Sequence, residues 1–67
     1  MSKTLKANIA YGKEAYGVSN ELLAATMEMS MATFKRRMAK PETFTVKELE
    51  QMAKRLHTTP SALLQAR

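Results

Sequence analysis

This chain of 67 residues has a formal net charge of +5 and is expected to form one domain, residues 1–67, since so short a chain buries only about 60% of its unfolded surface. With no cysteine and one histidine, it lacks the side chains for a disulfide scaffold, a thiolate metal site or a histidine-based metal cluster. It has no carboxylate pair, nucleophile–base pair or glycine-rich phosphate loop, and no apolar run long enough to span a membrane. We therefore expect a soluble, cytoplasmic protein that is not an enzyme, has no small-molecule substrate and needs no cofactor.

The first predicted element is a helix over residues 2–16. Leu5 and Ile9 share one face with Gly12, and a glycine inside a helix costs roughly 0.5–1 kcal/mol relative to alanine. Gly12 therefore indicates either a frayed helix or unusually close packing against a neighbour. Gly17 suits the left-handed position that ends a helix.

Residues 19–39 are predicted to form two short helices joined by a tight turn. Ser19 and Ser30 are good N-caps, because a serine hydroxyl accepts from the otherwise unpaired amides of the first helical turn. The two helices are therefore expected over residues 20–27 and about 31–39.

The second of these helices has two contrasting faces. Phe34 and Met38 lie four residues apart and form an apolar face that would hold the helix against the protein. Arg36 lies on the opposite side with small residues, and Lys35 lies on its flank. Residues 35–40 hold four cations and no acid, which is typical of a surface that binds a polyanion but also of a solvated charged face. Because this cluster follows a pattern of two short helices, we interpret it as a nucleic-acid-binding surface rather than as a solvated charged face.

Residues 39–44 are predicted to be a loop broken by Pro41. Thr45 and Glu48 have the spacing of a capping box at the start of the next helix. The predicted core stripe of that helix comprises Val46, Leu49, Met52, Ala53 and Leu56.

The last predicted helix starts at Thr59 and Pro60, with proline at the first helical position. Leu63 and Leu64 are adjacent and cannot both face one core. One is expected inside, and the other is either a subunit contact in a dimer or a tolerated surface leucine of a monomer. Together the elements predict an all-α, compact five-helix fold.

The order and spacing of these features resemble the small helix-turn-helix repressors of the phage repressor and Cro type, known as the XRE-type family. In that family a serine opens the second helix, a polar residue follows, and an alanine comes five residues after the serine. Ser19, Asn20 and Ala24 match this pattern, and Phe34 takes the place of the large apolar residue in the third helix. The segment TFKRRMAKPETFTVKELEQMAKRL is most similar to the prophage-encoded members.

The resemblance implies a helix-turn-helix motif at about residues 19–39, with one departure. The family prefers glycine where this chain has Glu28, because the turn needs a positive φ that a side chain resists. Glu28 would hold that conformation at a modest cost, or the angle between the two helices would differ.

The resemblance also implies base contacts from the third helix, which enters the major groove in this family. By position, the residues facing base edges are Ser30, Met31, Ala32, Lys35 and Arg36. Arg36 is the best candidate for direct reading, because a guanidinium can bond O6 and N7 of guanine together. Ala32 suits a thymine methyl or simply gives clearance, and Lys35 could reach either a base or a phosphate. Met31 fits the edge of the core better than a base contact.

Phosphate contacts are implied for Lys13, Asn20, Arg37, Lys40 and Thr43. Asn20 would bond a phosphate at a helix N-terminus, where exposed amides favour an anion, or is simply an exposed first-turn residue. Arg37 suits either a phosphate contact or capping of its own helix. Lys40 and Thr43 belong to a loop that lies along the phosphates in the family. Met38 replaces the acid of a buried Arg–Glu pair in the family, so no such pair is expected between the first and third helices.

The predicted function is that of a sequence-specific, DNA-binding transcriptional regulator similar to the Cro-like repressors of phages and prophages. Its partner would be double-stranded DNA, bound as a homodimer on a two-fold operator if the exposed leucine is a subunit contact. The alternatives are an adaptor or antirepressor that docks a protein through Met29, Met31 and the spare leucine, or the antitoxin of a toxin–antitoxin pair. A cationic third helix argues against an adaptor, which has no need of it.

Overall fold

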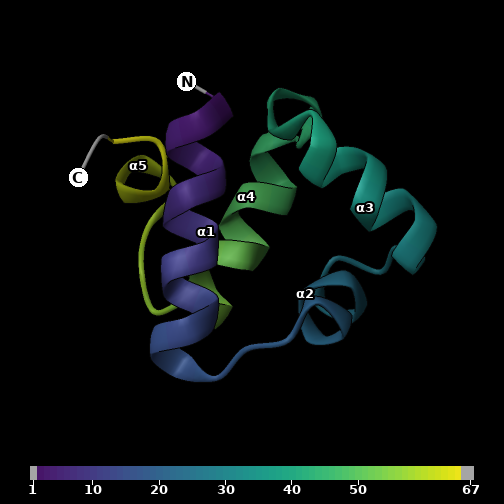
Figure 1. Ribbon diagram of the computed structural model, residues 1–67, viewed down its shortest axis with the longest axis horizontal. Coiled ribbons are helices and arrows are strands. Elements are labelled where there is room, and N and C mark those ends of the chain that lie inside the picture. Colours follow the sequence, from purple (N-terminus) through teal and green to yellow (C-terminus); the bar gives the residue numbers. More distant parts are fainter. Residues whose placement is uncertain (1, 66–67) are drawn as a thin grey trace.

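The computed structural model describes residues 2–65, which form five α-helices, one 3-10 turn and no strand (Figure 1). In chain order the elements are α1 (Ser2–Tyr16), α2 (Asn20–Thr26), α3 (Met31–Ala39), η1, the 3-10 turn (Pro41–Thr43), α4 (Val46–Arg55) and α5 (Pro60–Leu63). The predicted all-α, five-helix fold is confirmed. Residues 1, 66 and 67 of the predicted domain lie outside the described residues. Within the described part, no helix combines the length and apolarity needed to cross a membrane.

The helices after α1 all begin with the same type of cap. The side chains of Ser19, Ser30, Thr45 and Thr59 accept a hydrogen bond from the amide three residues further on, at 3.0–3.1 Å. At α4 the carboxylate of Glu48 also accepts from the amide of Thr45 at 2.9 Å, which completes the predicted capping box. These bonds satisfy amides that a helix start otherwise leaves unpaired.

Three helices end on a residue with positive φ, namely Gly17 at 65°, Glu28 at 55° and His57 at 55°. After each of them, the next amide donates back to a carbonyl five residues earlier, at 2.9–3.0 Å, which is the Schellman pattern. Glu28 therefore adopts the conformation for which glycine is better suited, at a cost of roughly 1–2 kcal/mol. The turn between α2 and α3 is kept in spite of this residue.

The core is formed by side chains from all five α-helices and from η1. Its largest fully buried side chains are Phe34, Ile9, Leu23, Met52, Leu56 and Leu63, together with Pro41. Gly12 is part of this packing, because a Cβ added there would lie 3.1 Å from the Cβ of Leu56. Since α1 continues through Gly12 to Tyr16, close packing rather than fraying explains the glycine.

The structure corrects two predictions about the second half of the chain. Val46 is 71% exposed at the first position of α4, so it does not belong to the core stripe. The predicted loop around Pro41 contains η1, and Pro41 itself is buried. Of the adjacent leucines, Leu63 is 2% exposed and Leu64 is 38% exposed. This confirms the prediction that one of them lies in the core and the other at the surface.

A buried polar side chain that the sequence did not indicate holds α5 in place. Asn8, on α1, is 6% exposed, and its Nδ2 donates to the carbonyls of Leu63 and Gln65 at 2.8 Å each and to that of Ala62 at 3.3 Å. These carbonyls lie at the C-terminal end of α5, where a short helix leaves its acceptors unpaired. Asn8 therefore attaches the last helix to the first.

Candidate nucleic-acid interface

α2 and α3 form a helix–turn–helix arrangement at one end of the molecule (Figure 1). In Figure 1, α2 is seen nearly along its axis, whereas α3 runs diagonally across the picture, so the two helices are steeply inclined to each other. Ala24 is 3% exposed, and α2 and α3 contact each other, as expected where a small residue lets two backbones approach. Glu28 adopts the positive φ of the turn, and α2 and α3 pack together across it.

The inner face of α3 is held by apolar side chains. Phe34 is 1% exposed, and Met31 and Met38 are partly buried and pack against the core. Met31 thus lies at the edge of the core, which the sequence favoured over a base contact. Met29, just before the helix, is partly buried in the same way.

The outer face of α3 is largely exposed. Of the predicted base-facing residues, Ser30, Ala32, Lys35 and Arg36 are exposed, and Lys40 follows them at the end of the helix. Among residues 2–65, neither Lys35 nor Arg36 lies in an ion pair. This face therefore combines small residues, which allow close approach, with cations that no acid of the described chain neutralises.

A hydrogen-bonded ladder runs along this face. The hydroxyl of Ser30 donates to Oγ1 of Thr33 at 3.1 Å, and Nη2 of Arg36 donates to the same Oγ1 at 3.2 Å. The three residues are three apart in sequence, so they occupy one side of the helix. Thr33 was absent from the predicted site, although the spacing Ser30-x-x-Thr33-x-x-Arg36 is visible in the sequence.

Two of the predicted phosphate residues meet at the start of α2. Nζ of Lys13, near the end of α1, lies 2.6 Å from Oδ1 of Asn20. Because Oδ1 accepts from the ammonium group, the side-chain amide of Asn20 is held in one orientation. Its Nδ2 can then donate to another acceptor. The turn at Gly17 brings the two residues together, and their pairing could not be predicted from the sequence spacing alone.

Arg37 is directed toward the protein. Its side chain is 29% exposed, and its Nη1 donates to Oε1 of Glu48 at 2.7 Å and to the carbonyl of Thr43 at 3.0 Å. Neither predicted role, a phosphate contact or capping of its own helix, included this ion pair. The pair joins α3 to the capping box of α4, rather than α3 to α1 as in the family.

The end of α3 and η1 border a shallow depression. Its lining comprises Thr33, Arg36, Arg37, Ala39, Lys40 and Thr43. The amide and the hydroxyl of Thr43 both donate to the carbonyl of Lys40, at 2.9 and 2.7 Å. The phosphate contact predicted for Thr43 stays a prediction, and Lys40 is an exposed cation beside it.

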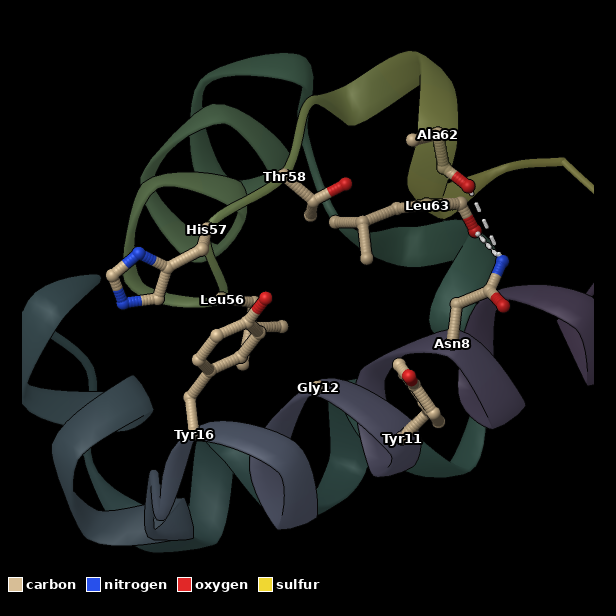
Figure 2. Close-up of a pocket in the computed structure, with 9 residues that line it drawn as sticks. All are labelled: Asn8, Tyr11, Gly12, Tyr16, Leu56, His57, Thr58, Ala62 and Leu63. Atoms are coloured by element: carbon tan, nitrogen blue, oxygen red, sulfur yellow. Dashed lines mark hydrogen bonds between the residues drawn. The ribbon is translucent and has the colours of Figure 1, made fainter.

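A second, smaller pocket lies on the other side of α1, away from α3 (Figure 2). It has a volume of about 150 Å³ and lies between α1 and the connection from α4 to α5. Figure 2 shows the ring of Tyr16 beside that of His57, whose centroids lie 4.4 Å apart, and the Asn8 amide bonded to α5. No charged group of α3 faces this pocket, so the cationic surface and the pocket are separate features.

Comparison with known proteins adds no family to these observations. No family model matches the chain, and no curated protein or solved structure matches it. The function of the protein is therefore inferred from the geometry of α3 and its neighbours, and the resemblance to phage repressors remains an expectation from the sequence.

Proposed function

We propose that this protein is a sequence-specific DNA-binding regulator that inserts α3 into the major groove, as a small repressor similar to the Cro-like proteins of phages and prophages. The observation that carries the proposal is the division of α3 into two faces. Phe34 is buried, whereas Lys35 and Arg36 are exposed and lie in no ion pair of the described chain. A helix that is held from behind and is cationic in front fits the width and charge of the groove.

In this proposal the two kinds of contact come from different parts of the surface. Arg36, Lys35, Ala32 and Ser30 would face base edges, because they share the exposed side of α3. Lys13 with Asn20 and Lys40 would bind the phosphates that flank the groove, and so set the position of α3. Occupying a promoter in this way would block transcription, and two copies would read a two-fold operator.

The competing adaptor function has less support. It required Met29 and Met31 to form an apolar docking surface, and both are partly buried against the core. Of the residues on which that hypothesis rested, Leu64 is the most exposed, at 38%. An antitoxin would also bind DNA, so a DNA-binding experiment gives the same expected result for a repressor and for an antitoxin.

Selection of bound sequences from a random DNA pool, followed by competition binding, tests the proposal. We expect an enriched half-site, bound more tightly than unrelated DNA of the same length, and an affinity that falls by about 0.9 log units per log unit of salt for each phosphate neutralised. Binding of every sequence with equal affinity would contradict the proposal, because it would show only the attraction of a basic protein for a polyanion.

A matched pair of lysine substitutions locates the interface. Lys40→Ala removes one charge at the end of α3, and Lys54→Ala removes one from the exposed side of α4. We expect Lys40→Ala to weaken binding to all sequences alike and to reduce the salt slope by about 0.9, while Lys54→Ala leaves both unchanged. Equal losses of DNA affinity in the two variants would show that the binding surface does not lie at α3.

A further inference from the structure

We infer that Thr33 is a positioning residue for DNA reading, which holds the guanidinium of Arg36 in the orientation that meets a base edge. The inference rests on the proposed function for its DNA-binding consequence, but the positioning itself concerns the free protein. Neither the periodicity of α3 nor the resemblance to phage repressors assigns Thr33 a role.

The geometry of the ladder carries the inference. Thr33 contributes one oxygen, Oγ1, which accepts from Ser30 at 3.1 Å and from Nη2 of Arg36 at 3.2 Å. Ser30 is itself fixed as the N-cap of α3, since its Oγ accepts from the amide of Thr33 at 3.1 Å. The oxygen that Arg36 contacts is therefore tied to the rigid start of the helix, not to a mobile side chain.

The bond leaves Arg36 able to read a base. A guanidinium carries five N–H donors, and Thr33 uses one of the two on Nη2. The remaining donors still include a parallel pair on one edge of the group, which is what O6 and N7 of guanine require. A partner on its own helix restricts the arginine before binding, so less conformational freedom is lost when the base contact forms.

Arg37 shows that the arrangement at Arg36 is specific to its side of the helix. Its guanidinium is bound by Glu48 and by the carbonyl of Thr43, both C-terminal to α3, and it makes no hydrogen bond to Thr33. Arg37 therefore serves as an internal reference, an arginine whose order does not depend on the Thr33 hydroxyl.

The first test measures the free protein. Thr33→Val removes Oγ1 and keeps the branched shape, whereas Thr33→Ser keeps the hydroxyl. We expect the heteronuclear NOE at Nε of Arg36 to fall in Thr33→Val, to be retained in Thr33→Ser, and to be unchanged for Arg37 in both variants. An unchanged NOE at Arg36 in Thr33→Val, with thermal unfolding showing that the variant folds, would overturn the inference.

The second test measures sequence preference, as the ratio of affinities for the selected half-site and for unrelated DNA. We expect Thr33→Val to reduce the ratio by about twofold to tenfold, and Thr33→Ser to restore it. In an Arg36→Ala background, Thr33→Val should reduce the ratio no further, because the group that it positions is gone. A further reduction there would show that Thr33 contacts DNA itself and would overturn the positioning role.

The two tests separate failure of this inference from failure of the proposed function. A wild-type protein with no sequence preference contradicts the proposed function, and with it the specificity assigned to Thr33, whatever the NOE at Arg36. A wild-type preference that Thr33→Val leaves unchanged contradicts this inference alone.

Discussion

Two adjacent arginines of α3 have opposite environments. Arg36 is exposed, and among residues 2–65 its side chain is hydrogen-bonded to Thr33 of its own helix alone, at 3.2 Å. Arg37 is 29% exposed and binds Glu48 of α4 at 2.7 Å. One residue of helix rotation, about 100°, moves a guanidinium from the outer face of α3 to its junction with α4.

The difference shows that charge alone does not identify a nucleic-acid contact. Both arginines belong to the same cluster of cations, and the cluster as a whole predicts a polyanion partner. Arg37 is used within the protein, where it neutralises the carboxylate that completes the α4 capping box. The outer face of α3 and the α3–α4 junction therefore have separable roles, and the predictions below test that separation.

Phe34→Ala should have the largest effect, because it removes the side chain that holds α3, which carries both arginines, against the core. Truncation of a phenylalanine that is 1% exposed is expected to lower the free energy of unfolding by about 3–5 kcal/mol. A chain of 67 residues has only about 3–10 kcal/mol in total, so much of the population would unfold. Urea denaturation measures the change, with Leu64→Ala as a control at a half-exposed site. A loss no greater than that of the control would mean that Phe34 does not anchor α3.

Arg36→Lys should change DNA preference without changing stability. Lysine keeps the charge but cannot bond O6 and N7 of guanine in parallel, so discrimination should fall by about 1–3 kcal/mol at one base pair. Affinity for unrelated DNA and the salt slope should stay the same, and unfolding should shift by less than about 0.5 kcal/mol. Competition binding with single-base variants of the half-site measures the effect. If all sequences weaken together, Arg36 binds phosphate.

Disruption of the Arg37–Glu48 pair should lower stability without changing DNA sequence preference. Arg37→Ala and Glu48→Gln, alone and together, form a double-mutant cycle whose coupling energy we expect to be about 0.5–1 kcal/mol, since the two side chains are 29% and 18% exposed. Sequence preference should be unaffected, while overall affinity should drop only as far as one lost cation requires. A coupling energy near zero would show that the junction does not depend on this pair, and a loss of preference in Arg37→Ala would give both arginines the same role.

Glu28→Gly should have the smallest effect and a stabilising sign. It replaces a side chain at φ 55° by the residue that takes this conformation freely, offset by the greater freedom of glycine in the unfolded chain, for a net gain of about 0.5–1 kcal/mol. Glu28→Gln is the control, because it removes the charge and keeps the strained φ. The DNA sequence preference of Glu28→Gly should equal that of Glu28→Gln, which has lost the same negative charge. Equal stability of the two variants would mean that the turn is not strained by its side chain.

The parts of the molecule that could be predicted are those in which a residue acts on its near neighbours. The caps at Ser19, Ser30 and Thr45, the positive φ at Gly17 and the burial of Phe34 all follow from interactions within about four residues or from helical periodicity. The outward direction of Lys35 and Arg36 follows in the same way. The all-α fold and the two faces of α3 were therefore accessible from the residues alone.

The contacts that periodicity could not supply join different elements. Asn8 binds carbonyls 54–57 residues away, and Arg37 pairs with Glu48 across η1. Val46 has the apolar character and spacing of a core residue, yet it is exposed because the packing of α4 begins one turn later. Such pairings depend on where whole helices lie relative to one another, and that placement is set by the burial of many side chains at once rather than by the pattern within any one helix.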